Sequence, residues 1–156
     1  MTHEGYLRHA IRLSREKMHE GQGGPFAAVV VVDGRVVGEG WNRVTSQNDP
    51  TAHAEVVAIR EACRTLSTFS LEGAVLYTSC EPCPMCLAAA YWAHISSVYY
   101  ANTTEDAASI GFDDGFIYEE LSKPAPERAL PCEQLAVEGA FSVFAEWAAM
   151  PDKVRY

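Results

Sequence analysis

The first regular pattern in the chain is an amphipathic helix over residues 3–20. Leu7, Ile11 and Met18 recur at helical spacing on one stripe, and charged residues fill the opposite face. A glycine-rich run over residues 21–25 follows. Glycine and proline interrupt helices, so we expect the helix to end there.

A β-hairpin is predicted directly after this helix. Residues 26–32 are apolar, Asp33-Gly34 is a preferred two-residue turn, and residues 35–41 form the second strand. The first strand is apolar at almost every position instead of alternating. We therefore expect it to lie in the centre of a sheet, buried on both faces.

Helices and strands then alternate along the chain. The expected elements are helix 53–67, strand 74–78, helix 84–94 and strand 97–101. This alternation adds parallel pairing to the hairpin and places helices on both faces of the sheet, which is an α/β fold.

The pattern weakens after residue 102. Short helices are expected at 104–108 and 116–122, and residues 133–137 fit either a last strand or an extended arm. A final helix over residues 140–149 carries three aromatic side chains at helical spacing. Such a helix covers either the core of its own domain or that of a partner subunit.

Length, composition and charge narrow the class of protein. A chain of 156 residues fits one domain, and its longest apolar run, residues 25–32, is too short to cross a bilayer. The first residues lack the layout of a signal peptide, so we expect a cytoplasmic protein without a membrane partner. A net charge of −9 argues against nucleic acid as a partner.

Two short motifs carry the chemistry: His53-Ala54-Glu55, and a cysteine cluster that contains Cys83 and Cys86. One imidazole and two thiolates are good zinc ligands, and three protein ligands leave the fourth position open for water, as in catalytic sites. Glu55 is close enough to move protons without binding the metal. H-x-E followed by P-C-x-x-C is the signature of zinc nucleobase deaminases.

Two other interpretations of the cysteines stay open. The site is purely structural if Cys80 is a fourth ligand, but a closed site has no use for Glu55. Cys83 and Cys86 alone also fit a redox pair at the start of a helix, an interpretation in which His53 has no role. A non-catalytic, zinc-stabilised interaction domain is the corresponding alternative for the whole chain.

With these motifs the chain resembles the cytidine deaminase-like superfamily over residues 26–101. The likeness extends nearly end to end to the bacterial guanine deaminases. It rests on Gly24-Pro25-Phe26, Asn42, residues 48–55, residues 78–86, Tyr91-Trp92-Ala93, residues 111–114 and Tyr156.

The resemblance implies a three-layer α/β/α sandwich around a five-stranded mixed sheet, with one Zn²⁺ per subunit. It also implies a homodimer that exchanges its C-terminal segments, about residues 130–156. The implied reaction converts guanine and water to xanthine and ammonia. Guanosine, cytosine and tRNA adenosine are the rival substrates, and the acidic charge argues against tRNA.

By the same resemblance, each motif residue has an expected role. Glu55 and Asp114 are the expected catalytic residues, and His53, Cys83 and Cys86 the metal ligands. The residues expected to contact the substrate are Phe26, Asn42, Ala54, Trp92, Asp114 and Tyr156. The sequence by itself leaves plainer alternatives open: an acidic loop at 113–114, a turn residue at 42, core aromatic side chains and a frayed terminus.

Overall fold

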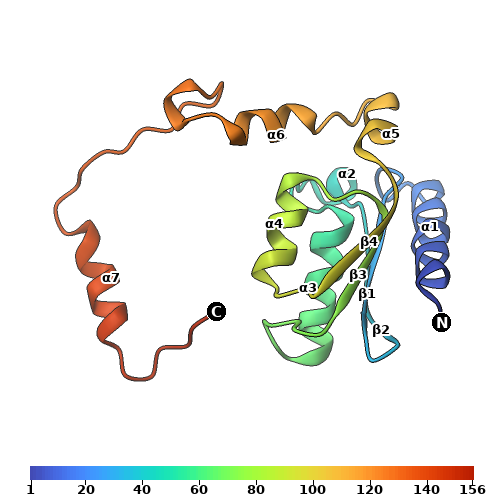
Figure 1. Cartoon of the computed structure of the whole chain (residues 1–156), viewed down its shortest axis with the longest axis horizontal. Helices are drawn as coiled ribbons and strands as arrows, with labels where there is room; N and C mark the ends of the chain where they lie inside the picture. The colour runs from blue at the N-terminus through green and yellow to red at the C-terminus, as the bar shows by residue number, and fades with distance from the viewer. The chain divides into compact units, whose positions relative to one another are not determined.

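The computed structural model describes all 156 residues, which divide into two units, Met1–Gly115 and Phe116–Tyr156 (Figure 1). The elements that lie in the first unit are α1 (His3–His19), β1 (Ala27–Val32), β2 (Arg35–Trp41), α2 (Val44–Gln47), α3 (Ala54–Leu66), β3 (Val75–Cys80), α4 (Pro84–Trp92), β4 (Ser97–Asn102) and α5 (Thr104–Ser109). From Gly115 onward the chain forms α6 (Gly115–Ser122), the 3₁₀ turn η1 (Ala125–Glu127) and α7 (Ala140–Ala149).

The sheet is mixed and has the strand order β2-β1-β3-β4. Strand β1 runs antiparallel to both β2 and β3, and β4 runs parallel to β3. The predicted hairpin is confirmed, with Asp33 and Gly34 both at positive φ in its turn. The expectation of five strands was wrong, because the sheet has four.

The missing strand is the segment 133–137, which has no regular secondary structure. Its apolar residues lie at three successive positions and do not alternate with polar ones, and no neighbouring strand pairs with it. Of the two predictions for this segment, the extended arm is the one that the structure bears out.

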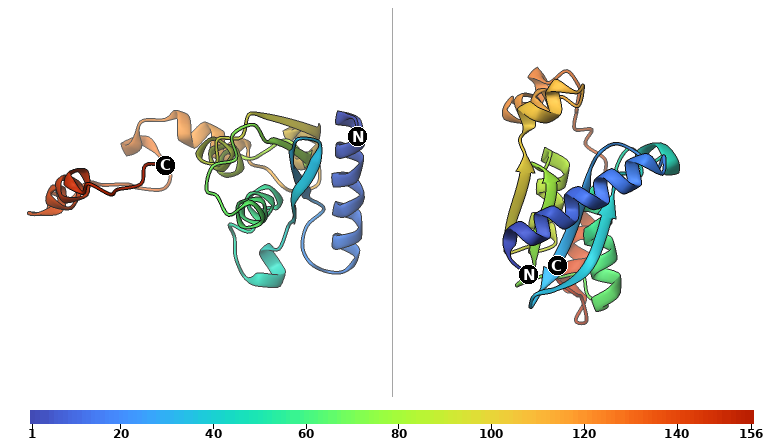
Figure 2. Two further views of the ribbon diagram at one scale, coloured as in Figure 1. Left: turned by 90° about the horizontal axis from the view of Figure 1, so that it is seen from below. Right: turned by 90° about the vertical axis from the view of Figure 1, so that its right-hand side faces the viewer.

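Helix α1 covers one face of the sheet, and α3 and α4 lie on the other, so the three-layer α/β/α sandwich is confirmed (Figure 2). Alternate residues of β1 point into two separate cores. Val29 and Val31 pack with Tyr6 and Tyr77 under α1, whereas Val30 joins the core under α3. The expectation that this strand is buried on both faces is therefore confirmed.

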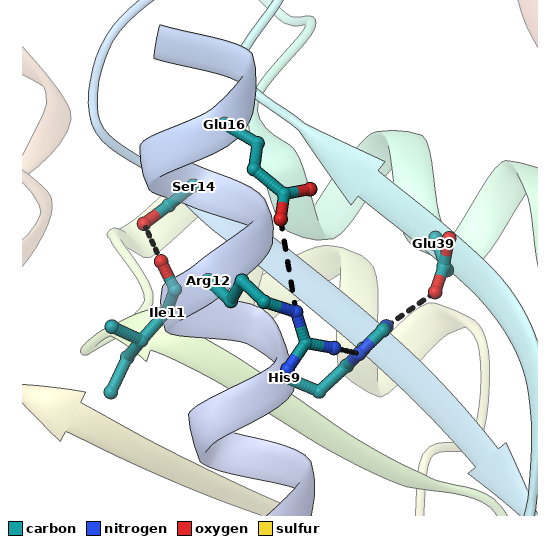
Figure 3. A network of polar contacts seen from close by, with 6 residues as sticks. All are labelled: His9, Ile11, Arg12, Ser14, Glu16 and Glu39. Carbon is teal, nitrogen blue, oxygen red and sulfur yellow. Dashed lines mark hydrogen bonds and ion pairs between the residues drawn. The ribbon is translucent and has the colours of Figure 1, made fainter. Parts of the chain in front are cut away.

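A polar network joins α1 to the edge strand β2 (Figure 3). The Arg12 guanidinium, which can only donate, lies 2.5 Å from Nδ1 of His9. His9 therefore carries its hydrogen on Nε2 and donates it to Glu39 at 2.5 Å. Arg12 also pairs with Glu16 at 3.8 Å, an exposed contact that adds little stability. The imidazole is thus the link between the helix and the strand.

Helix α3 lies directly against β2 because two glycines of the strand face it. A Cβ on Gly40 would be 2.1 Å from the carbonyl oxygen of Ala54, and one on Gly38 would be 2.4 Å from that of Ala58. Any larger residue at these positions would push the helix off the sheet. The start of α3 is therefore held at a fixed height above β2.

The second unit, taken by itself, has no buried residue. Its apolar side chains are mostly exposed, for example Phe141 at 76% and Phe144 at 71%, although these two rings contact each other edge-on. A segment that buries so little apolar surface does not offset its conformational entropy. No helix anywhere in the chain has both the length and the apolar character needed to span a membrane.

Candidate active site

Two helix N-termini supply the three predicted metal ligands. His53 is the N-cap residue of α3, and Cys83 is the N-cap residue of α4. Pro84 opens α4, where its missing N–H costs nothing, and Cys86 follows in the same first turn. The first-turn N–H groups and the helix dipoles favour negative charge at this point, as thiolate ligands require.

The three side chains have the spacing of a metal site. Nδ1 of His53 lies 3.5 Å from Sγ of Cys83 and 3.5 Å from Sγ of Cys86, and all three ligand atoms lie within 4.8 Å of one another. Tetrahedral zinc with ordinary Zn–N and Zn–S bonds would separate nitrogen from sulfur by about 3.6 Å. The geometry and the donor chemistry therefore fit Zn²⁺ without rearrangement.

The pKa values of the two cysteine thiols are shifted in opposite directions. Hydrogen bonds from the Cys86 thiol and from His53 lower the pKa of Cys83 to about 4. The same interaction with Cys83, together with burial, raises the pKa of Cys86. Because both cysteines bind a metal as thiolates, metal binding by this pair releases protons.

The third cysteine of the cluster lies outside the ligand group. Sγ of Cys80 points to the carbonyl oxygen of Thr103 at 3.6 Å, and burial raises the pKa of this thiol to about 11. It therefore stays protonated and packs as a small apolar side chain. The protein supplies three grouped ligands, so the geometry favours an open catalytic site over a closed structural one.

Glu55 lies in the first turn of α3 with a side chain that is almost completely buried. Its Oε1 accepts a hydrogen bond from the hydroxyl of Thr78 at 3.3 Å, and burial raises the pKa of its carboxyl group. A raised pKa suits a group that must accept and release a proton near neutral pH. Thr78 was not among the predicted site residues, although its hydroxyl in an otherwise apolar, buried strand was a signal.

The structure separates the two neighbouring aspartates. Oδ1 of Asp113 accepts the backbone N–H of Gly115 at 3.0 Å, so this exposed residue forms a turn. Oδ1 of Asp114 is buried and has no hydrogen-bond partner, and burial raises the pKa of its carboxyl group. The charge of Asp114 also helps to raise the pKa of His53, and the charge of Cys83 helps to raise that of Asp114, so the carboxylate is within electrostatic range of the metal ligands.

Asn42 is buried, and one end of its amide is already in use. Its Oδ1 accepts the backbone N–H groups of Gly24 at 3.3 Å and Val44 at 3.2 Å. The Nδ2 amino group is the end that is left for a ligand. Asn42 thus holds the neighbouring loops as the turn alternative expects, and its contact with a substrate stays a prediction.

The other predicted contacts are distributed as follows. Phe26 is half-buried before β1, and Ala54 is fully buried at the first position of α3. Trp92 ends α4 with 68% of its surface exposed, which does not fit the core alternative. Tyr156 belongs to the second unit and is 78% exposed, so its contact with a substrate stays a prediction.

Comparison with known proteins agrees with this geometry. Residues 1–102 match the family model described as the zinc-binding region of cytidine and deoxycytidylate deaminases. A guanine deaminase of Bacillus subtilis strain 168 is 51% identical over 156 residues, which is the full length of both chains. A tRNA-specific adenosine deaminase of Aquifex aeolicus strain VF5 is 31% identical over 94% of each chain.

A solved structure extends the likeness to the whole chain. The X-ray structure of guanine deaminase from Bacillus subtilis superposes with a TM-score of 0.97 at 51% identity, covering 100% of this chain and 99% of the other. The family match together with the His53, Cys83 and Cys86 group identifies zinc as the cofactor.

Replacing Cys86 with serine should abolish zinc binding, because it removes one of only three protein ligands. Metal analysis of the purified protein should find about one zinc per subunit in the parent and almost none in the variant. Cys80→Ala is the matched control and should keep its zinc. Loss of zinc from Cys80→Ala would show that the site has four protein ligands.

Proposed function

The chain belongs to the cytidine and deoxycytidylate deaminase zinc-binding family, and from this premise we propose that it is a guanine deaminase. The observation that carries the choice of substrate is the buried Oδ1 of Asp114, which has no hydrogen-bond partner and belongs to a carboxylate within electrostatic range of the metal ligands. Guanine presents N–H donors on its ring and on its exocyclic amine. A carboxylate oxygen that lacks a donor is the complementary atom.

The reaction breaks the bond between C2 of guanine and its amine and forms a bond from C2 to a water oxygen, giving xanthine and ammonia. When bound, zinc supplies the Lewis acidity that makes water nucleophilic near neutral pH. Glu55 accepts a proton from the water and delivers protons to the ring and to the departing amine. Its burial beside the ligands and its raised pKa support this role.

The remaining residues hold the ring in place. Asp114 accepts hydrogen bonds from guanine and assists in proton transfer, and Asn42 donates from Nδ2 to an acceptor atom of the ring. Phe26 and Trp92 stack on the two faces of the purine. Ala54 lines the substrate-binding site, and Tyr156 excludes water from this site.

One rival substrate has specific support. The 31% identical relative is named a tRNA-specific adenosine deaminase, so adenosine in tRNA is the second candidate. The net charge of −9 opposes a polyanion, because phosphate contacts need lysine and arginine. Adenine also lacks the two adjacent N–H donor groups that Asp114 would match.

Ammonia release from guanine, guanosine, cytosine, adenine and an adenosine-bearing anticodon stem tests the assignment. Guanine should be the fastest substrate, and Glu55→Gln should abolish turnover because an amide cannot carry the proton. Zinc content and melting temperature of this variant should match the parent. Faster turnover of another substrate would overturn the choice of guanine, and no turnover at all would favour a zinc-stabilised interaction domain.

The two aspartates should differ in their effect on guanine turnover. Asp114→Ala removes the acceptor for the substrate and should lower kcat/KM by about 100-fold or more, the cost of leaving buried donors unpaired. Asp113→Ala removes only a turn hydrogen bond and should cost far less. Steady-state kinetics on guanine measures both variants, and the reverse order would place the substrate carboxylate at Asp113.

We further propose that the protein is a cytoplasmic homodimer whose C-terminal segments, about residues 130–156, exchange between subunits. The absence of any buried residue in the second unit supports this, because α7 needs another surface to cover Phe141, Phe144 and Trp147. Thiolate ligands are also most durable in the reducing cytoplasm. In this arrangement Tyr156 of one subunit closes the active site of the other.

Exchange predicts that two inactive chains restore each other. Glu55→Gln keeps Tyr156 but cannot transfer protons, and a chain lacking Tyr156 keeps Glu55 but has an open site. In a mixed dimer formed by co-expression, one active site combines an intact Glu55 with an intact Tyr156, so guanine turnover should return. Each chain expressed alone is the control. Mixed dimers without activity would show that each tail closes its own site.

A further inference from the structure

The loop that carries Asp114 is fixed at its first end by the end of α5. Gly111 has a φ of +95°, a conformation that favours glycine. Its N–H bonds to the carbonyl oxygen of Ala108, and the N–H of Phe112 bonds to that of Ala107, each at 3.0 Å. This is the Schellman pattern of helix ends, and it fixes the backbone of Phe112.

The side chain of Phe112 attaches the loop to the other substrate residues. Its ring contacts the ring of Phe26 edge-on, with centroids 4.9 Å apart at 88°, a favourable geometry for aromatic pairs. Gly24 leaves room for both rings, since a Cβ there would lie 3.3 Å from each. Gly24 also donates its N–H to Oδ1 of Asn42. Phe112 therefore packs on the segment 24–26, which contains Phe26 and binds the side chain of Asn42.

The second fixed point of the loop follows Asp114. The Asp113 carboxylate accepts the backbone N–H of Gly115, which closes a turn around the intervening residue. Asp114 thus lies between the anchored ring of Phe112 and this turn. Its Oδ1 is buried without a protein donor, although the backbone on both sides of it is held.

We propose that Phe112 is a positioning residue that sets Asp114 against the donor edge of the purine. It does so by fixing the Asp114 loop to Phe26. Phe26 lies two residues after Gly24, whose N–H binds the side chain of Asn42. The inference rests on the proposed function for the identity of the ligand. A carboxylate that binds guanine benefits from being fixed in this way, because misplacement by about 1 Å in an active site can lower the reaction rate greatly.

The test compares Phe112→Leu with Phe69→Leu. Both side chains are about half exposed, at 47% and 57%, but Phe69 lies in the loop between α3 and β3. Phe112→Leu should raise KM for guanine about tenfold, equivalent to about 1.4 kcal/mol. Because Asp114 also assists in proton transfer, kcat should fall, but by less than KM rises, with zinc content unchanged. Phe69→Leu should match the parent.

A double-variant comparison shows whether Phe112 acts through Asp114. The dissociation constant of guanine is measured in the Glu55→Gln background, where the ligand is not consumed. Phe112→Leu should weaken binding about tenfold when Asp114 is present and less than about twofold when Asp114 is alanine, because coupled residues are non-additive. Equal effects in both backgrounds, or a Phe112→Leu variant that behaves like Phe69→Leu, would overturn the proposal.

Amide exchange separates this inference from the proposed function. Phe112→Leu should speed hydrogen exchange at the Gly115 amide about tenfold, because the turn opens more often when its ring anchor is lost. An unchanged exchange rate would refute positioning whatever the ligand is. A parent protein that neither binds nor converts guanine would refute the proposed function alone, and the exchange rate would still decide the role of Phe112.

Discussion

The close packing of α3 on β2 is the constraint on which the rest of the site depends. With only hydrogen atoms at Gly38 and Gly40, the helix backbone rests on the strand backbone, and its first turn cannot shift along or away from the sheet. That turn carries His53 and Glu55. Strand β3, two places along the sheet, leads directly into α4 and its cysteines. The sheet therefore sets the distance between the two helix ends that share the metal.

The polar side chains around the site fall into two groups: those that are hydrogen-bonded within the protein and those that are not. Oδ1 of Asn42 and the carboxylate of Asp113 are committed to backbone N–H groups, and they shape loops. Oδ1 of Asp114, by contrast, is buried and has no hydrogen-bond partner in the protein. An unpartnered buried oxygen costs stability in the free protein, and a ligand with matching donors recovers that cost on binding. Asp113, which is hydrogen-bonded to the backbone, therefore shapes the loop, whereas the free oxygen of Asp114 is suited to bind a ligand.

Local motifs were predictable from the sequence, and long-range placement was not. The ligands and Glu55 were found because each lies within one helical turn whose start is marked by proline or turn residues. The hairpin followed from its two-residue turn. The residues themselves do not distinguish Asp114 from Asp113, and only the resemblance selected Asp114; the difference between them in the structure is one of burial and backbone contacts. The contact between Phe26 and Phe112 joins residues far apart in the chain, and no periodicity reports it. A fifth strand was expected by analogy, where the chain has an unpaired arm.

The second unit, which has no core of its own, is synthesised after the first unit, and this order affects folding. Residues 116–156 leave the ribosome after both cores, the three ligands and Asp114 have been made. A nascent chain can thus assemble its sheet and acquire its metal before the exposed aromatic helix exists to misassemble. Under the proposed exchange between subunits, burial of this helix is a separate, later event whose rate depends on the concentration of finished molecules, so the rate of synthesis sets how quickly the protein reaches its final state.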